Sequence, residues 1–235
     1  MIVRCGLLKK HDGLTREQFS DHWLNVHGPI AAGMTHLRGY YQNLVVGEDR
    51  LYPVASGGVV LDGYSELHFE THAAMLEGIQ SLDAATGNAL LDDAEILLDR
   101  RLCDILVLSR SVVREVPPYL PREGLLRYAV FFGRADDVDN AAFHRAWGYA
   151  HARLINLAPG LAGYRQNSVF DRSVAGVPAS YAQLSCDGFE ELFFESEAAF
   201  ACFRESEEFQ RAAEHAAKFA GTIDAYRIEM HPVMG

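Results

Sequence analysis

The sequence contains the same set of motifs twice, at a nearly constant separation. The motif F-x3-W-x3-H begins at Phe19 and again at Phe143, and G-Y-x-Q-N begins at Gly39 and again at Gly163, so both pairs lie 124 positions apart. Such a constant separation indicates an internal duplication, because unrelated halves would not keep several motifs in one register. The chain is therefore expected to fold as two related halves.

A third motif and a proline-rich segment locate the boundary between the halves. The motif D-G-x-x-E-L-x-F-E begins at Asp62 and again 125 positions later at Asp187, so one residue was gained in the loop that precedes it. Segment 116–124 contains three prolines within five positions, a composition typical of an extended connector. We therefore expect two repeats, at residues 1–117 and 118–235.

Each repeat is expected to follow the order strand, helix, strand, strand, helix, strand. The expected strands are 2–8, one from 39, 63–70 and 102–108, and then 126–132, one from 163, 188–195 and 223–230; the later helices are 71–80, 88–99, 196–205 and 207–220. This is the order of the ferredoxin-like fold, an α+β arrangement with helices on one face of an antiparallel sheet. The uncovered sheet faces are apolar, so the two repeats are predicted to pack sheet to sheet as a fused α+β barrel around a cavity.

Composition excludes several classes of function. The net charge of −11 argues against nucleic acid or an anionic membrane surface as a partner. Four cysteines without C-x-x-C spacing are typical of reduced thiols, and no apolar run approaches the roughly 20 residues of a membrane span. The first ten residues do not follow the signal-peptide pattern, so we expect a cytoplasmic protein. No glycine-rich phosphate loop and no H-E-x-x-H motif is present, which predicts no nucleotide, metal or other cofactor.

Taken together, the three duplicated motifs resemble those of the EthD family, in the dimeric α+β barrel superfamily. Family members are usually single repeats that dimerise, so the chain resembles a fused pseudo-dimer, and further pairing of two chains stays open. The resemblance to methylmuconolactone isomerase implies acid–base chemistry without a cofactor, with His27 and Tyr40, or His151 and Tyr164, in the pocket. The cysteines of that enzyme have no clear match, because position 67 is leucine here.

Two pairs of residues are candidate acid–base groups. His27 and His151 lie at the edge of an apolar helical stripe, where an imidazole is suited either to proton transfer or to a structural bridge between helix and sheet. Glu66 and Glu191 alternate with apolar residues that face the helices, so their side chains are expected inside the barrel, as partners of the histidines or as structural ion pairs. Tyr40 and Tyr164 are candidates to stabilise an oxyanion, or are core aromatics.

The remaining candidates are residues expected to line the cavity and hold a substrate: Tyr64, His68, Leu7, Phe131, Phe189 and Phe193. Because the first repeat carries Tyr64 and His68 where the second carries two phenylalanines, the first repeat is expected to hold the working pocket. The leading hypothesis is a cofactor-independent lyase or isomerase that acts on a small aromatic, lactone or polyketide-like metabolite. The alternatives are a ligand-binding accessory protein for an oxygenase and a haem-binding oxidoreductase.

Overall fold

The computed structural model describes residues 1–86, 89–99, 104–118, 120 and 124–234. The first repeat contains β1 (Ile2–Leu8), α1 (Arg16–His22), η1 (Trp23–His27), α2 (Gly28–Ala31), β2 (Gly39–Asp49), β3 (Gly63–Phe69), α3 (His72–Thr86), α4 (Ala89–Leu97) and β4 (Asp104–Arg114). The second contains β5 (Leu126–Arg134), α5 (Asn140–Arg145), η3 (Ala146–His151), α6 (Ala152–Leu157), β6 (Leu161–Val174), β7 (Val177–Pro178), β8 (Gly188–Phe194), α7 (Glu197–Glu205), α8 (Glu207–Ala216) and β9 (Ala220–Met234). The expected start of the last strand of the first repeat at Leu102, together with Cys103 and Pro121, lies outside the described residues.

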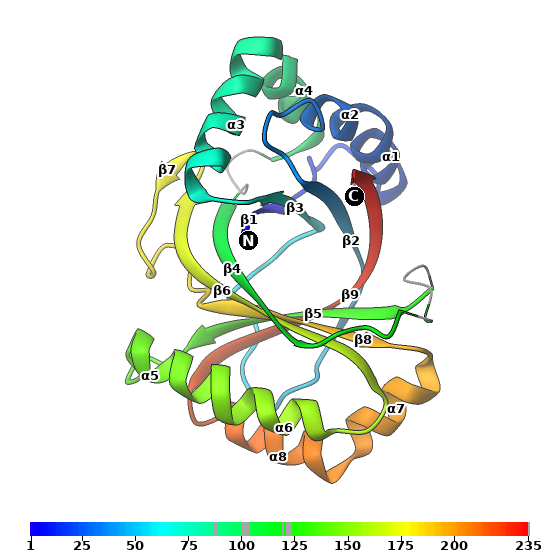
Figure 1. Ribbon diagram of the computed structural model, residues 1–235, viewed down its shortest axis with the longest axis vertical. Helices are drawn as coiled ribbons and strands as arrows, with labels where there is room; N and C mark the ends of the chain where they lie inside the picture. Colours follow the sequence, from blue (N-terminus) through cyan, green and yellow to red (C-terminus); the bar gives the residue numbers. More distant parts are fainter. Residues whose placement is uncertain (87–88, 100–103, 119, 121–123, 235) are drawn as a thin grey trace.

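The two repeats form one closed antiparallel barrel, as expected for a fused α+β barrel. Within the first repeat the strand order is β4-β1-β3-β2, and within the second it is β9-β5-β8-β6, with the short β7 added to β6. Hydrogen bonds between β2 and β9 and between β4 and β6 join the two sheets at both edges. Backbone hydrogen bonds therefore join the two repeats into one sheet, and the repeats also face each other across the interior. Helices of each repeat cover the outside of the barrel (Figure 1).

The strand register decides which side chains face the interior. In the first repeat, Tyr40 is paired with Leu67 and Tyr41 with Glu66. Paired residues of neighbouring strands point to the same side of a sheet. Leu67 packs with helix residues in the outer core, so Tyr40 lies on the helix side, whereas Glu66 and Tyr41 face the interior.

A packed apolar core fills one end of the barrel. Leu7, Tyr64, Phe131 and Phe189 are all buried there, and the rings of Phe131 and Phe189 stack with their centroids 4.8 Å apart. Tyr64 contacts both rings edge-on, at 5.9 and 5.6 Å. They were predicted to line the cavity, but they pack against one another and are not among the residues that line the open chamber at the other end of the barrel.

The duplicated W-x3-H motif forms a π turn in both repeats, η1 and η3. The side-chain amide of Gln42 donates a hydrogen bond to the carbonyl of Trp23 at 2.8 Å, and Gln166 donates to Trp147 at 3.0 Å. Single π turns tend to mark functional positions. The glutamine of the G-Y-x-Q-N motif therefore connects each π turn to its sheet. This contact fixes the position of the histidine at the end of the W-x3-H motif.

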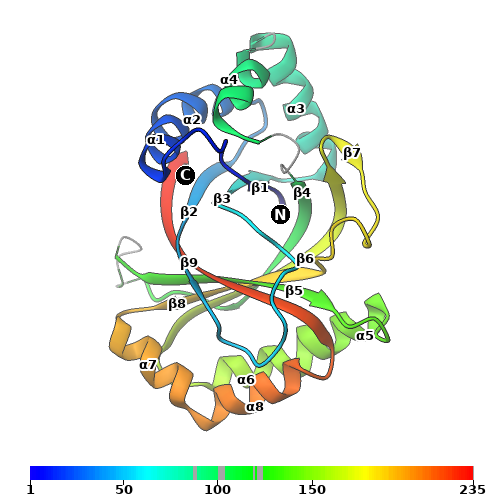
Figure 2. The same ribbon diagram turned by 180° about the vertical axis from the view of Figure 1, so that it is seen from behind.

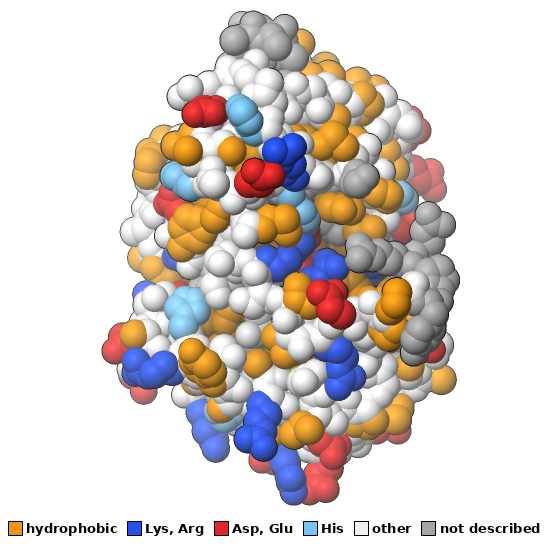
Figure 3. All heavy atoms as spheres, in the orientation of Figure 1, with side chains coloured by type: hydrophobic (Ala, Val, Ile, Leu, Met, Phe, Trp, Pro, Cys, Tyr) orange, Lys and Arg blue, Asp and Glu red, His pale blue; other side chains and the backbone are white. Residues whose placement is uncertain are grey.

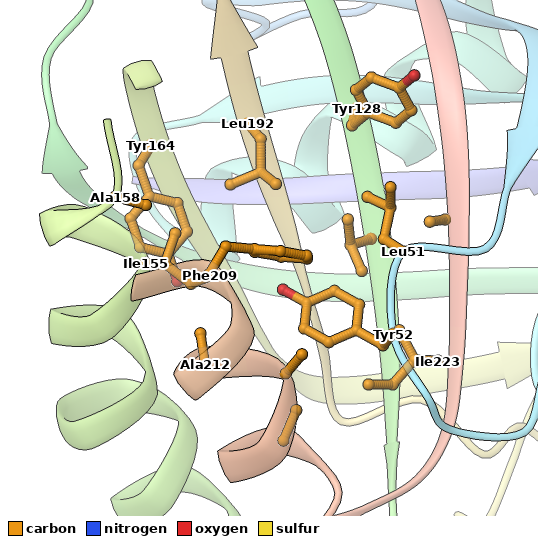
Figure 4. Close-up of a cluster of buried hydrophobic side chains, with 14 of the residues drawn as sticks. Leu51, Tyr52, Tyr128, Ile155, Ala158, Tyr164, Leu192, Phe209, Ala212 and Ile223 are labelled. Carbon is orange, nitrogen blue, oxygen red and sulfur yellow. The ribbon is translucent and has the colours of Figure 1, made fainter. Parts of the chain in front are cut away.

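The loop at 50–62 of the first repeat crosses to the second repeat (Figure 2). Its Tyr52 is buried between the strands of the second repeat and α8, where its ring lies 5.3 Å from that of Phe209 (Figure 4). The carboxylate of Asp224 on β9 accepts hydrogen bonds from the hydroxyl of Ser56 and from the backbone N–H groups of residues 57–59, at 2.8–2.9 Å. The two repeats thus share side-chain contacts as well as backbone pairing.

Cysteines and helix lengths agree with the expectations from composition. The described cysteines Cys5, Cys186 and Cys202 form no disulfide. Burial raises the pKa of the Cys5 thiol well above its ordinary value, and it raises that of Cys186 to about 12. Within the described ranges, every helix is too short or too polar to cross a membrane.

Candidate functional site

The second end of the barrel holds an open chamber of about 1140 Å³. Met1 and Glu115 are among its lining residues, its inner polar groups come from β2, β3, β4, β5, β6 and β8, and further charged groups come from β9 and from the start of α7. The lining side chains that carry the argument below are Tyr41, Glu66, His68, Arg110, Arg127, Arg165, Glu191 and Phe193. Basic and histidine side chains gather at the centre of this face of the molecule (Figure 3).

The charged groups of the chamber meet around Arg110. Its Nη2 atom lies 2.7 Å from Oε2 of Glu66 and 3.0 Å from Oε2 of Glu191, so one guanidinium bridges the duplicated carboxylates. Its Nε donates to Oδ1 of Asn167 at 2.8 Å, and Nδ2 of Asn167 donates to Glu191 at 3.2 Å. The side chains of Arg110 and both glutamates are at most 8 % exposed, so these charges compensate one another in a largely water-free setting.

His68 completes this network on the first repeat. Its Nε2 lies 2.9 Å from Oε2 of Glu66 and 3.3 Å from Nη1 of Arg110. The shorter distance to the carboxylate indicates that Nε2 carries the ring proton and donates a hydrogen bond to Glu66. Nδ1 is then the ring atom that is able to accept a proton. The ring of Tyr41 lies against the imidazole, with centroids 5.1 Å apart.

Electrostatics keep Glu66 ionised. Burial by itself would raise the pKa of this carboxyl, but the charge of Arg110 and the hydrogen bond from His68 outweigh it and hold the pKa well below its usual range. For Arg110, burial opposes the charge, and the two carboxylates nevertheless raise the pKa of the guanidinium. Glu66 therefore serves as a fixed negative charge that orients His68, and it is not suited to be the proton carrier itself.

The wall of the chamber supplied by the second repeat carries different groups. Arg127 and Arg165 lie on the two strands that flank β8, and their guanidinium carbons are 5.1 and 5.0 Å from the ring centroid of Phe193. Arg165 also lies 3.9 Å from Oε1 of Glu191. We call Arg127, Phe193 and Arg165 the arginine wall. Two cations against one aromatic ring make a surface that is both apolar and positively charged.

His27 and Tyr40 lie outside the barrel, so the expectation that they share a pocket with Glu66 is wrong. Nδ1 of His27 lies 2.8 Å from Asp93 on α4, a carboxylate that also contacts Nε2 of His22 at 2.7 Å. Burial lowers the pKa of His27, although Asp93 opposes this effect. The hydroxyl of Tyr40 accepts a hydrogen bond from Gln42 under the helices, where burial raises its pKa to about 12. The hydrogen-bond partner of His27 is thus Asp93 on α4, and not Glu66.

His151 and Tyr164 occupy the matching place in the second repeat, but in a closed polar cluster. Tyr164 donates to Oε1 of Glu190 at 2.5 Å, and Gln166 donates to the same oxygen at 3.2 Å. Nε2 of His151 is 3.4 Å from that oxygen, too far and too poorly aligned for a hydrogen bond. His151 and Glu190 are completely buried. The cluster has the acid–base groups that the resemblance implies, yet the described residues leave no opening to it.

A separate hollow of about 1060 Å³ lies on the outer surface between η3 and β6. Two of its three arginines are held by the protein itself. Arg134 pairs with Asp187 at 2.5 Å, and Arg172 donates to the carbonyl of Leu184 at 3.1 Å. This hollow has no paired acid and base comparable to His68 and Glu66, so the barrel chamber is the candidate site.

Comparison with known proteins agrees with this architecture. Residues 135–223 match the model of the EthD domain. This match lies within the second repeat, which is therefore similar to an EthD domain. The solved structure of an anthrone oxidase-like protein is similar over 100 % of this chain and 94 % of its own, with a TM-score of 0.57 at 10 % identity. A putative monooxygenase from Lactobacillus acidophilus is similar over 97 % and 93 %, with a TM-score of 0.53 at 9 % identity.

A dye-decolorizing peroxidase from Bacteroides thetaiotaomicron is likewise similar over 97 % of this chain and 92 % of its own, with a TM-score of 0.52 at 10 % identity. Identities this low indicate a shared fold alone. A comparison with curated proteins finds no match. The chain thus has the fold of the α+β barrel proteins, and its second repeat, which holds the EthD match, shares the duplicated motifs with the first repeat.

The EthD domain offers no space for haem at its motif histidine. The ring of His151 is surrounded by the rings of Tyr52, Phe132, Phe219 and His215, with centroids 5.6–6.1 Å away. A macrocycle at this nitrogen would have to displace most of these rings. Among the described residues, no group of three or more histidine, cysteine or acidic side chains is arranged to hold a metal ion.

Sequence reasoning missed the three arginines of the chamber. For Arg127 a signal was available, because it alternates with Ala129 and Phe131 on a strand whose inner face was already assigned. Arg165 follows Tyr164 in the duplicated strand motif and so points to the opposite side of the sheet. Arg110 lies beyond the strand end expected at Leu108, and only its pairing with the other repeat shows that the strand continues.

Proposed function

We propose that this protein is a cofactor-independent lyase or isomerase that moves a proton on a small, partly apolar metabolite inside the barrel chamber. The observation that carries the proposal is the His68–Glu66 pair, joined at 2.9 Å and placed on the inner surface of a chamber large enough for such a molecule. A buried carboxylate that orients an imidazole is the usual arrangement of a histidine general base. His68 takes the role that the sequence suggested for His27.

Each group of the network has a distinct task in this scheme. Glu66 accepts a hydrogen bond from Nε2–H of His68 and holds the ring, so Nδ1 removes a proton from the substrate and returns it at a second position. Arg110 keeps Glu66 ionised through its 2.7 Å contact. Its positive charge, 3.3 Å from the imidazole, also favours the anion that proton removal creates. No step requires a metal or an organic cofactor.

Solvent deuterium incorporation tests the proposal. Purified protein is incubated in D2O with a panel of carbon acids, namely an enolisable ketone, a β-keto acid and an unsaturated lactone, and each is analysed by mass spectrometry. We expect incorporation into at least one compound, a loss of about 100-fold or more in His68→Ala and a smaller loss in Glu66→Gln. His27→Ala is the matched control and should retain activity, because its ring faces α4. Equal rates in the His68 and His27 variants would refute the assignment.

A second function has one specific observation in its favour. Glu66 and Glu191 are both paired with Arg110, a hydrogen-bonded arrangement that suits a rigid ligand-binding surface as well as it suits catalysis. In that case the protein holds an amphipathic metabolite for a partner oxygenase. Binding of a panel compound without any deuterium incorporation by the purified protein would favour this carrier function over the enzyme.

A further inference from the structure

The two motif histidines differ in their hydrogen bonds. Nδ1 of His27 contacts Asp93 at 2.8 Å, whereas neither nitrogen of His151 has a hydrogen-bond partner among the described residues. The hydroxyl of Tyr52 and Oε2 of Glu190 are also buried without a partner in the described part of the chain. These three side chains, which we call the Tyr52 cluster, are at most 3 % exposed, and burial without a hydrogen bond is unfavourable for such groups.

The members of the Tyr52 cluster lie together under the helices of the second repeat. The ring centroids of Tyr52 and His151 are 5.9 Å apart, and Nε2 of His151 is 3.4 Å from Oε1 of Glu190. Burial, and after it the charge of nearby Glu190, raises the pKa of the Tyr52 hydroxyl well above its ordinary value. Figure 4 shows this hydroxyl pointing to the side where Tyr164, the hydrogen-bond donor to Glu190, lies. An imidazole, a carboxylate oxygen and a phenol hydroxyl therefore share one enclosed place without bonding to one another.

Tyr52 does not belong to the repeat in which it is buried. It reaches the cluster from the loop between β2 and β3, and its ring packs edge-on against Phe132 and Phe209, with centroid distances of 5.6 and 5.3 Å. The positions 124 and 125 residues later, Gly176 and Val177, are exposed beside the start of β7, so the duplication does not repeat this contact. The second repeat thus holds a phenol group that a loop of the first repeat supplies.

Hydrogen bonds to β9 hold this loop at the edge of the barrel. The carboxylate of Asp224 accepts one from the hydroxyl of Ser56 at 2.8 Å, and it accepts three more from the backbone N–H groups of residues 57–59. None of these donors belongs to the Tyr52 cluster. The attachment of the loop can therefore be weakened at Ser56 without a change in the groups that surround Tyr52.

We propose that Tyr52 occupies a binding site for a small free phenol, and that the loop at 50–62 is a cover that this ligand displaces. The site is distinct from the barrel chamber and does not depend on the proposed function. The ring of the ligand takes the place of the Tyr52 ring between the same two phenylalanines. Its hydroxyl comes within hydrogen-bond distance of the imidazole and the carboxylate, a position from which the loop withholds the tethered tyrosine.

A phenol matches the unpaired groups of the cluster. Oε2 of Glu190 can accept a hydrogen bond and one ring nitrogen of His151 can donate one, and a single hydroxyl is able to take part in both. A hydrocarbon of the same shape would leave both groups unpaired. Because Tyr52 competes for the same place, the apparent affinity for a free phenol is reduced by the fraction of time that the cover is open.

Limited trypsin digestion in the presence of p-cresol tests the proposal. Arg50 is exposed but Leu51 and Tyr52 are buried, so trypsin can cut after Arg50 only when the loop leaves the second repeat. We expect p-cresol to accelerate this cut in the wild type by about threefold or more, and p-xylene, which has a methyl group in place of the hydroxyl, to have a smaller effect. A ligand that binds without displacing the loop would instead slow the cut or leave it unchanged.

Two variants separate the cover from the site. Ser56→Ala removes a hydrogen bond of the loop and should raise the affinity for p-cresol, measured by isothermal titration, by about threefold or more. Tyr52→Ala removes the internal competitor and should raise it by about tenfold or more, with p-cresol bound more tightly than p-xylene. Ser180→Ala, which removes an exposed hydroxyl hydrogen bond from the corresponding loop of the second repeat, is the matched control and should bind as the wild type does. Thermal melting of each variant verifies that it is folded.

Three results would overturn the proposal. In the first, p-cresol does not accelerate the cut after Arg50; in the second, Ser56→Ala binds p-cresol no more tightly than the wild type. In the third, Tyr52→Ala binds p-cresol and p-xylene equally well, which would mark a merely apolar space. Ser56→Ala keeps the Tyr52 cluster intact, so it decides the question even if Tyr52→Ala does not fold. A phenol bound only in the barrel chamber would leave the cut unchanged, and the deuterium assay does not involve the loop, so the two proposals fail independently.

Discussion

Arg110→Met tests how strongly the chamber depends on one buried cation. Methionine keeps the unbranched apolar stem of the side chain, but it leaves the carboxylates of Glu66 and Glu191 without the nitrogen that contacts both, at 2.7 and 3.0 Å. Both carboxylates are less than 10 % exposed, so water cannot replace the guanidinium. Removing one partner of a buried ion pair typically costs about 3–5 kcal/mol. We expect a loss in this range in the free energy of unfolding at pH 7.

The stability lost in Arg110→Met should be smaller at low pH, and the direction of this pH dependence follows from the pKa of Glu66. In the wild type the pKa of this carboxyl is held below its usual value of 4.5, so the unfolded state takes up the proton first and stability falls as the pH drops below 4.5 toward 2. In Arg110→Met the largest effect that opposes burial is removed, so the pKa of Glu66 moves up from its wild-type value. The variant then loses less stability than the wild type as the pH falls, and the two curves approach each other.

Urea unfolding followed by circular dichroism at pH 7 and pH 4.5 measures both effects. The triple variant Arg110→Met, Glu66→Gln, Glu191→Gln should recover most of the lost stability, because neutral amides replace the unpaired charges. Arg211→Met, which breaks an exposed pair with Glu207, should cost less than about 1 kcal/mol. A loss below about 1 kcal/mol in Arg110→Met, or an equal loss at both pH values, would show that solvent screens the network and would refute the reasoning.

Two further substitutions test the local geometry. Gly39→Ala would place a Cβ atom 3.2 Å from Cε2 of Tyr41 and 3.4 Å from Nδ1 of His68, so it would press on both rings of the site, and we expect slower deuterium incorporation with little change in melting temperature. Tyr164→Phe removes the 2.5 Å hydrogen bond to buried Glu190 and should cost about 1–3 kcal/mol in urea unfolding. Tyr40→Phe, its counterpart in the first repeat, contacts no carboxylate through a described hydrogen bond and should cost less. Equal losses in the two tyrosine variants would contradict this difference between the repeats.

Most of the fold could be predicted because each sequence motif and strand pattern occurs in both repeats. The strand expected at 2–8 has the observed bounds of β1, and β3 and β8 differ from expectation by one residue. The polar second half of β4, which continues to Arg114, was not predicted, because its stability comes from pairing with β6 of the other repeat and not from its own apolar pattern. Long-range pairing of this kind leaves little trace in a local sequence window.

The candidate site was predicted in part, by the alternation of side chains along strands. That rule correctly placed Glu66 and His68 on the inner face and Leu67 on the helix face. It was not applied to Tyr40, whose pairing with Leu67 puts it on the helix side, because the register between two strands is not visible in either one alone. Asp93, the partner of His27, belongs to no repeated motif, so only the three-dimensional structure brings the two together.

The two repeats carry different side chains at corresponding positions, which two identical subunits could not do. In a symmetric dimer any change appears in both walls, so an imidazole and an arginine pair could not occupy opposite positions of one chamber. Fusion removes that constraint. Arg110 pairs with Asn167 across the β4–β6 join, and Met230 pairs with Asn43, the counterpart of Asn167, across the β2–β9 join. A second arginine at Met230 would add another cation to the chamber. With sulfur there instead, Met230 contacts Nη1 of Arg127, and the single guanidinium of Arg110 is shared by Glu66 and Glu191, so the imidazole of the first repeat faces a wall of different chemistry in the second.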